Sequence, residues 1–376
     1  MQSNVKMMRG LIEQFVIPVC TKVLSGMDDV AYEVHPVNAQ EWDEVCDFAS
    51  SHGLMPVLFC YLQDIKLADQ QSTAVLINWY GNSFQQEQTT EVMAVVARKL
   101  AIIMQKAELD VMFLKGLSLA QYYPSPKMRM SADIDYYLYG KTEEGLKALE
   151  AAGIGTDDAW DYHVHAEMNG VRLELHKMFI DVDRIDSNRD VERALVQLAD
   201  EEGKTCRCEW MGENVANAYR MSPMMNAIFL MRHIGIHFVS EAVSLRMFYD
   251  WGLFLQHEGK DVDWNKVVAL YEQVGMMDFA RRIQSLVIDK LGMPVADCCP
   301  LKPLDDKQTM LIWESILSLE LNGNCQGSRL KIGLMRRYEM LRSRWKFKMV
   351  YPMDSFWKTY LYLAFRGIRT YSRSKR

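Results

Sequence analysis

The sequence predicts an α+β protein in which a small mixed β-sheet is held between helical N- and C-terminal parts. Apolar residues recur every three to four positions up to about residue 107, a spacing typical of amphipathic helices. Between about residues 110 and 180 the pattern changes to the alternation of half-buried strands, and helical spacing returns from about residue 190. The strands are predicted near 111–115, 133–138, 163–168 and 171–179.

The composition indicates a globular protein with more than one structural unit. Of the 376 residues, 49% are hydrophobic, enough for a sizeable core. No run of about 18 uncharged apolar residues exists, so we expect no transmembrane helix. Glu13 interrupts the first apolar stretch and no cleavage pattern of small residues follows it, so we expect a cytoplasmic protein. The eight cysteines form no C-x-x-C pair and are expected to be reduced thiols.

The first 107 residues are predicted to be helical. One helix opens at Asn38 or Glu41 and closes at His52-Gly53, because glycine commonly follows the end of a helix. A second helix is predicted for residues 54–63. A long third one, over about 82–108, leads the chain into the first strand. We interpret His52 as a surface or capping histidine.

Two predicted strands carry the residues with the clearest chemical meaning. The first ends in Lys115-Gly116, and the second contains Asp133 and Asp135. Because side chains alternate along a strand, the two aspartates point to the same face, about 7 Å apart. Paired carboxylates suit Mg²⁺. Gly116 lets the backbone approach a phosphate, and Lys115 and Arg129 can neutralise its oxygens, so we interpret this region as a nucleotide site.

An Asn-Gly turn lies between the next two predicted strands. Asn169-Gly170 separates 163–168 from 171–176, and this dipeptide between alternating strands is the strongest short-range hairpin signal. In a two-residue loop, facing residues lie at equal distances from the turn. The predicted polar pairs are Glu167 with Arg172, His165 with Glu174 and His163 with His176. The predicted apolar pairs are Met168 with Val171, Ala166 with Leu173 and Val164 with Leu175.

Histidine and glutamate dominate the polar face of this hairpin. His163, His165 and His176 are predicted to surround Glu174. One interpretation is a solvent-exposed strand face with a His/Glu pair. The other makes the three histidines accessory residues of the site, since histidines near a carboxylate also suit a transition metal.

Two further histidines lie on a predicted helix in the C-terminal part. Ser222-Pro223 begins this helix, with serine as the N-cap and proline in the first turn. His233 and His237 are four residues apart on one face, a spacing that also suits zinc. Because no glutamate follows His233 in the manner of H-E-x-x-H, we interpret the two as a packed or phosphate-facing pair.

The order of strand, glycine turn, spacer and D-x-D strand resembles the core of the DNA polymerase β-like nucleotidyltransferase superfamily. The wording L-K-G-x-x-x-A-x-x-Y-P-x-P-x-x-R-x-x-x-D-I-D, over residues 114–135, is similar to one branch, an uncharacterised bacterial nucleotidyltransferase family. Its members carry Lys-Gly in place of the usual Gly-Ser. The resemblance extends over most of residues 40–275.

This resemblance implies a metal-dependent transfer of a nucleoside monophosphate from an NTP to an unknown acceptor, which is a small molecule, a protein or RNA. It implies that Asp133, Asp135 and a third carboxylate hold Mg²⁺ or Mn²⁺. Glu174 is the best match for the third carboxylate, with Asp181 and Asp183 as alternatives. The implied phosphate contacts, helped by the helix N-terminus after the glycine, are Lys115, Gly116, Ser118 and Arg129. Because like charges cluster there, we expect Asp135→Asn to stabilise the ion-free protein slightly.

Composition divides the chain into four predicted parts. These are an N-terminal helical region (1–107), a nucleotidyltransferase core (108–188), a C-terminal helical domain (189–328) and a basic helical tail (329–376). The tail holds 14 lysines and arginines against two acids, whereas the residues before it carry an excess of about 18 negative charges. The tail is interpreted as a contact for nucleic acid or an anionic surface, or as a solvated helix that covers the acidic body.

Three alternatives to a transferase remain open. The first is a non-catalytic nucleotide-binding or scaffold protein that keeps the fold, which nucleotide binding without turnover would reveal. The second is a nucleic-acid or membrane-surface binder that acts through the basic tail, with steeply salt-dependent binding. The third is a histidine metalloprotein, which the metal content of the purified protein would test.

Overall fold

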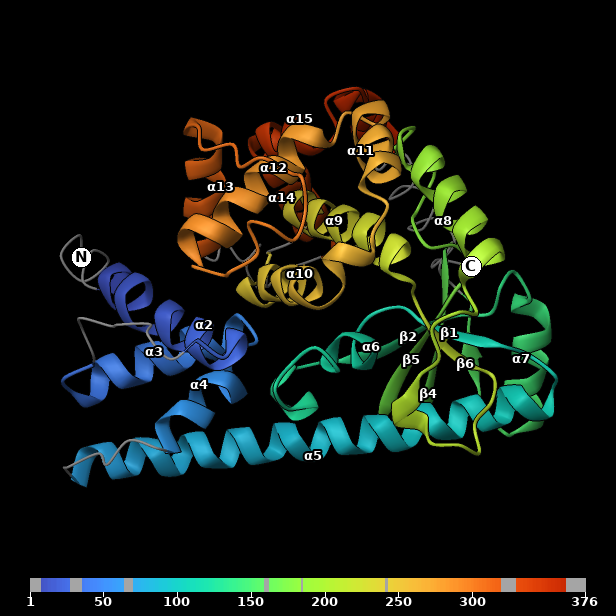
Figure 1. Cartoon of the computed structure of the whole chain (residues 1–376), viewed down its shortest axis with the longest axis horizontal. Coiled ribbons are helices and arrows are strands. Elements are labelled where there is room, and N and C mark those ends of the chain that lie inside the picture. The colour runs from blue at the N-terminus through green and yellow to red at the C-terminus, as the bar shows by residue number, and fades with distance from the viewer. Residues whose placement is uncertain are drawn as a thin grey trace.

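The protein is described by a computed structural model over residues 8–27, 36–63, 70–158, 162–183, 185–240, 243–318 and 329–362. In the chain, a six-stranded sheet comes between helical N- and C-terminal parts, which confirms the predicted α+β class. In space, the sheet lies to one side of the N-terminal helices (Figure 1). The predicted basic tail falls within this description only over residues 329–362. Within these ranges no helix has the length and apolar character needed to cross a membrane.

The N-terminal part is helical, as predicted. Its α-helices are α2 (Ile17–Ser25), α3 (Ala39–Ser51), α4 (Met55–Gln63) and α5 (Gln70–Lys106). Asn38, not Glu41, caps α3: its side-chain oxygen accepts the backbone N–H of Glu41 at 3.0 Å. Helix α5 begins at Gln70 rather than near residue 82. It runs from the N-terminal helices to the sheet and so connects the two (Figure 1).

The sheet is mixed, with the strand order β3-β4-β5-β2-β1-β6. Its strands are β1 (Val111–Phe113), β2 (Asp133–Tyr137), β3 (Thr156–Asp157), β4 (His163–Met168), β5 (Val171–His176) and β6 (Ala218–Arg220). β2 is parallel to β5 and β1 to β6, whereas the other neighbours are antiparallel. The four predicted strands are confirmed. β3 and β6 were not predicted, because two or three residues are too few to show an alternating pattern.

The β4–β5 hairpin has the predicted register in all six pairs, including His165 opposite Glu174. Asn169 and Gly170 have φ values of 53° and 75°, as a type I′ turn requires at both central positions. Glycine and asparagine adopt this left-handed conformation more readily than other residues do. The turn therefore sets which side chains share each face of the hairpin.

The two faces of the sheet differ in what covers them. Apolar strand residues such as Ile134, Tyr136 and Leu173 pack against Val96 and Leu100 of α5 in one buried cluster. A short helix, α6 (Leu117–Ala120), follows β1, and α7 (Thr142–Ala151) follows β2. The opposite face carries the charged residues of β2, β4 and β5, since alternate side chains point to opposite faces. Tyr137, on that face, belongs to the core of the C-terminal helices.

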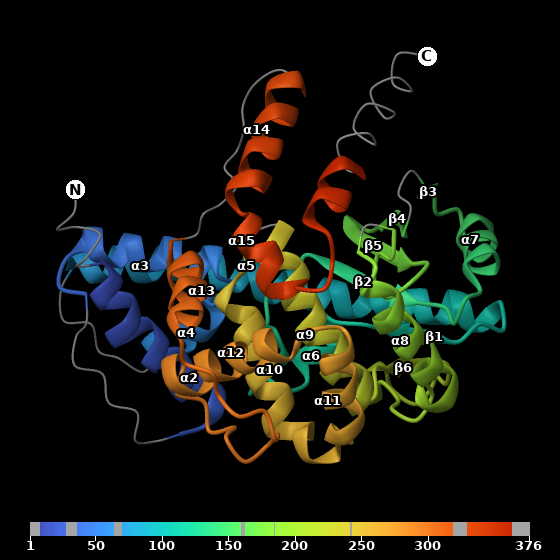
Figure 2. The ribbon, with the colours of Figure 1, turned by 90° about the horizontal axis from the view of Figure 1, so that it is seen from above.

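The C-terminal part is a group of helices that shares its core with the N-terminal ones. These are α8 (Asn188–Glu202), α9 (Pro223–Ser240), α10 (Leu245–Glu258), α11 (Trp264–Gln273), α12 (Met277–Ser285), α13 (Lys307–Leu317), α14 (Arg329–Arg342) and α15 (Arg344–Val350). The Tyr249 hydroxyl lies 3.0 Å from Thr21 Oγ1 and donates to the Ile17 carbonyl at 3.1 Å. Helix α2 of the N-terminal part is therefore packed against α10 of the C-terminal part. Helix α14 projects from this body (Figure 2).

His52, which was interpreted as a surface or capping histidine, does not lie on the surface. Its side chain is fully buried, and its Nδ1 accepts the backbone N–H of Leu245 at 3.0 Å, at the first residue of α10. The histidine therefore caps a helix that lies far away in the sequence. Local sequence around His52 contains no signal for this contact.

Candidate active site

One row of charged side chains crosses three strands of the sheet. In the register of the sheet, His165 on β4 lies opposite Glu174 on β5, and Glu174 lies beside Asp135 on β2. The row continues to Lys115, just after β1, whose Nζ lies 3.1 Å from Asp135 Oδ1. Glu174 and Asp135 thus lie on the same face in neighbouring strands, and the sequence analysis predicts this shared face but not the parallel pairing.

Gly116 shapes the turn that delivers Lys115 to this row. It has a φ of 59°, and a Cβ there would lie 3.5 Å from the carbonyl oxygen of Asp133. The backbone of the turn therefore passes close to β2, as expected for a glycine. The helix after it, α6, has only four residues, too few for the helix dipole that was expected to assist phosphate binding. We therefore do not include the N-terminus of α6 among the proposed phosphate contacts.

Asp135 is buried and held by two basic groups. Its Oδ1 lies 3.1 Å from Lys115 Nζ and 3.0 Å from His176 Nε2. Burial alone would raise the pKa of Asp135, but Lys115 and His176 lower it well below its ordinary value. The ionised carboxylate is therefore stabilised in the folded protein. Asp135→Asn should lower stability, contrary to the expectation from clustered like charges.

The two neighbouring carboxyls behave in the opposite way. Burial, together with the charge of Asp135, raises the pKa values of Asp133 and Glu174 above their ordinary values. The pKa of Lys115 is raised too, because the attraction of Asp135 and Asp133 outweighs its burial. Burial and the charge of Asp135 therefore both disfavour the ionised forms of Asp133 and Glu174. A divalent cation would favour these ionised forms.

One set of potential ligand atoms differs from the predicted set in one member. Asp135, Glu174 and His176 each offer an atom, and these atoms lie within 4.8 Å of one another. Asp133 is not part of any such group among the described residues. Asp135 Oδ2 and His176 Nδ1 are buried and have no hydrogen-bond partner within the described ranges. Oδ2 is therefore an acceptor suited to a cation.

The histidine side of the row is partly buried. The rings of His163 and His165 stack, with centroids 4.5 Å apart and planes inclined by 25°. Burial and the neighbouring imidazoles of His176 and His165 lower the pKa of His163 to about 4, so its ring is neutral near pH 7. His165 Nε2 lies 3.9 Å from Glu174 Oε1, and its side chain is 25% exposed. The interpretation of a solvent-exposed strand face is therefore wrong for His163 and His176, which are both buried.

Two residues that were predicted to contact phosphate are buried and form hydrogen bonds within the protein instead. Arg129 is 4% exposed, and its guanidinium donates from Nε and Nη2 to the two carboxylate oxygens of Asp250, at 2.8 Å each. Ser118 is also buried, and its Oγ donates to the Phe113 carbonyl at 3.0 Å. We therefore revise both assignments: Arg129 fixes the loop before β2 against α10, and Ser118 closes the turn after β1.

The alternatives for a third carboxylate lie elsewhere. Strand β5 ends at His176 rather than near residue 179, and Asp181 and Asp183 follow it in a loop. Glu192 on α8 fixes that loop by accepting the backbone N–H groups of Phe179 and Ile180 at 3.1 and 2.8 Å. Of the three candidates, only Glu174 is paired with Asp135 in the register of the sheet.

Two buried basic residues of the C-terminal helices interact electrostatically with charged residues of the site. Burial and the neighbouring charge of Arg129 lower the pKa of Arg246 on α10, whereas Asp250, Tyr123 and Asp133 act in the opposite direction. Burial also lowers the pKa of His233 on α9 well below its ordinary value, and Lys115 reinforces this effect. His233 meets His237 edge to face, at 4.4 Å between centroids.

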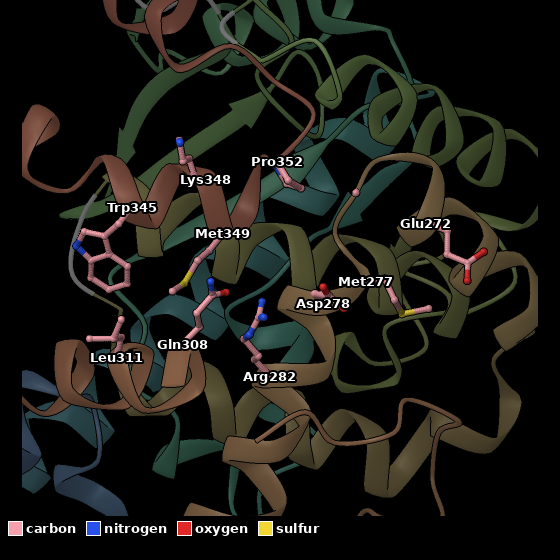
Figure 3. Close-up of a pocket in the computed structure, with 11 residues that line it drawn as sticks. Glu272, Met277, Asp278, Arg282, Gln308, Leu311, Trp345, Lys348, Met349 and Pro352 are labelled. Carbon is pink, nitrogen blue, oxygen red and sulfur yellow. The ribbon is translucent and has the colours of Figure 1, made fainter. Parts of the chain in front are cut away.

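A separate cavity of about 660 Å³ lies among the C-terminal helices (Figure 3). Glu272 of α11, Arg282 of α12, Gln308 of α13 and Lys348 of α15 line it. None of the residues of the candidate site lines this cavity. We therefore keep the two features apart.

Fold and site together define an α+β protein whose mixed sheet gathers carboxylates, histidines and a lysine on one face. The model of the family described as uncharacterised nucleotidyltransferase matches residues 38–287, and the chain belongs to that family. The match includes every strand of the sheet and helices α3 to α12. No curated protein and no solved structure shows a significant match to the chain.

Proposed function

We propose that the protein is a metal-dependent nucleotidyltransferase of the DNA polymerase β-like superfamily, which transfers a nucleoside monophosphate from an NTP to an unidentified acceptor. The observation that carries this proposal is the pairing of Asp135 with Glu174 on adjacent strands, with Lys115 beside them. Family membership supports nucleotidyl transfer. The non-catalytic nucleotide-binding protein remains the second candidate.

Asp135 and Glu174 are the proposed ligands of the divalent ion, Mg²⁺ or Mn²⁺, with Asp133 two residues away on the same strand face. The buried and unpaired Oδ2 of Asp135 and the raised pKa values of Asp133 and Glu174 fit a cation at this position. Bound ions would neutralise the triphosphate and activate the acceptor oxygen.

Lys115 is the proposed phosphate contact. Lys115 supplies a compact positive charge next to the carboxylates, and Gly116 keeps the turn free of a side chain. In the transfer, an acceptor oxygen forms a bond to the α-phosphorus while the bond to the β-bridging oxygen breaks. Pyrophosphate leaves with the negative charge, which Lys115 would stabilise, and the acceptor proton passes to water.

Thermal melts with each NTP, with and without Mg²⁺, test the proposal. A ligand at about a hundred times its Kd stabilises the folded state by about 2.7 kcal/mol, so wild type should show an increase in Tm that depends on Mg²⁺. Asp135→Asn and Glu174→Gln should fold but lose this increase, because each removes a negative charge at nearly constant shape.

Asp183→Asn is the matched control, since Asp183 is an exposed carboxylate in the loop after β5. It should keep the full shift. Equal shifts in wild type and Asp135→Asn, or no shift in wild type with any NTP, would contradict the proposal. A shift without release of pyrophosphate in the presence of varied acceptors would favour the non-catalytic nucleotide-binding protein.

A further inference from the structure

A second group of potential metal ligands lies on the same sheet face, on the side away from Lys115. His163, His165 and Glu174 each offer one donor atom, and these atoms lie within 4.8 Å of one another. Small rotations of the side chains would bring all three onto one ion at bond lengths of about 2 Å. The group belongs to the hairpin and includes neither Asp133 nor Asp135.

The strands hold this group in a fixed arrangement. His165 and Glu174 are direct cross-strand partners, and His163 lies two residues before His165 on the same face and stacks against it. His176, directly opposite His163, is 5% exposed and has a buried Nδ1 with no hydrogen-bond partner among the described residues. Ligands on regular strands are positioned more accurately than ligands on loops.

The ligand types differ between the two groups. The first group, Asp135, Glu174 and His176, contains two carboxylates and suits Mg²⁺ or Mn²⁺. The second contains two imidazoles and one carboxylate, a set that favours zinc, cobalt or nickel over magnesium. Glu174 occurs in both groups. A carboxylate has two oxygens, so it can contact an ion on each side.

We propose that His163, His165 and Glu174 bind a divalent transition-metal ion such as Zn²⁺ or Co²⁺, and that Glu174 links this ion to the Mg²⁺ position at Asp135. A role for this ion in transfer rests on the proposed function, whereas its binding does not.

Titration of the metal-free full-length protein with Co²⁺, followed by visible absorption, tests this proposal. Wild type should bind one Co²⁺ at this position with the spectrum of a nitrogen-containing, four-coordinate site, and Zn²⁺ but not excess Mg²⁺ should displace it. His165→Ala should weaken Co²⁺ binding at least about tenfold, since even the loss of an outer partner of a ligand has an effect of that size. His165→Gln provides a second variant of similar volume.

Glu167→Gln is the control, because Glu167 is exposed on the same strand face two residues from His165. It should bind Co²⁺ like wild type. Absence of the spectrum in wild type, displacement by Mg²⁺, or unchanged Co²⁺ affinity in both His165 variants would overturn the proposal. Mg²⁺-NTP melts on the same samples separate the two proposals: histidine-dependent Co²⁺ binding without a nucleotide shift would refute only the proposed function.

Discussion

The hairpin β4–β5 and the loop from Lys115 to Arg129 contribute to the same site, but they are determined in different ways. In the hairpin, a local turn and the alternation of side chains set every pair, so His165 faces Glu174 as the sequence predicts. In the loop, contacts with distant helices decide which side chains can meet a ligand. Arg129 is held by Asp250, 121 residues further along the chain.

This difference shows which features of the site sequence patterns cannot predict. Periodicity and turn chemistry predict which residues share a face, because both depend on neighbours in the chain. Whether a basic residue is available to a phosphate depends on which carboxylate lies near it after folding. Three variants test this comparison, one in the loop, one at a distant cap and one in the hairpin.

Arg129→Met is expected to give the largest loss of stability. Removing one partner of a buried ion pair costs about 3–5 kcal/mol, because the other charge is left buried without compensation. Among the described residues, Asp250 would keep the Tyr123 hydroxyl, at 2.8 Å, and the more distant Arg246, at 3.9 Å. Unfolding by guanidinium chloride measures the loss.

Lys127→Met is the control for Arg129→Met. Lys127 pairs with Glu91 at 2.6 Å on the surface, so its removal should not change stability measurably. If Arg129→Met were as stable as wild type, the buried pair would not fix the loop. Arg129 would then return to the candidate phosphate contacts.

The sequence predicted the site best where the backbone alone sets the geometry. Asp133 and Asp135 on one strand face and Glu174 on the adjacent hairpin follow from strand alternation and from the Asn169-Gly170 turn. The parallel pairing of β2 with β5 could not be derived in this way, because no short turn connects these strands. The resemblance to nucleotidyltransferases supplied that step.

The rest of the site depends on long-range packing. Arg246 on α10 interacts electrostatically with Asp133 on β2, and nothing in the local sequence of α10 indicates this interaction. The burial of Ser118 and Arg129 was missed for the same reason. The short strands β3 and β6 contain too few residues for a pattern, and their places depend on the strands beside them.

His52 offers a test of the distant cap through pH. Burial lowers its pKa to about 3, from an ordinary value of 6.5. The unfolded chain therefore binds a proton below about pH 6.5 that the folded protein does not bind. Stability contributed by the neutral ring is complete above this pH and is lost as the pH falls towards 3, by up to about 1.4 kcal/mol per pH unit.

In His52→Asn the amide oxygen can replace Nδ1 as the acceptor for Leu245, but it does not titrate. The free energy of unfolding should therefore fall less steeply between about pH 6 and pH 4 in the variant than in wild type. Urea unfolding at several pH values gives both slopes, and the carboxylates affect both proteins equally. Parallel curves would show that His52 is protonated in the folded state.

Gly170→Val should give the smallest loss, about 1 kcal/mol or more, because a β-branched residue resists the φ of 75° at this position. A Cβ there would meet no atom within 4 Å, so the loss can only come from the backbone. Gly170→Asn should recover part of this loss, since asparagine tolerates the left-handed conformation.

Gly155→Val is the control, because Gly155 also has open space around it but no positive φ. Thermal melts should therefore rank Gly170→Val below Gly170→Asn, with Gly155→Val close to wild type. An unchanged Tm in Gly170→Val, or equal losses in both Gly170 variants, would mean that the turn does not set the register that places His165 opposite Glu174.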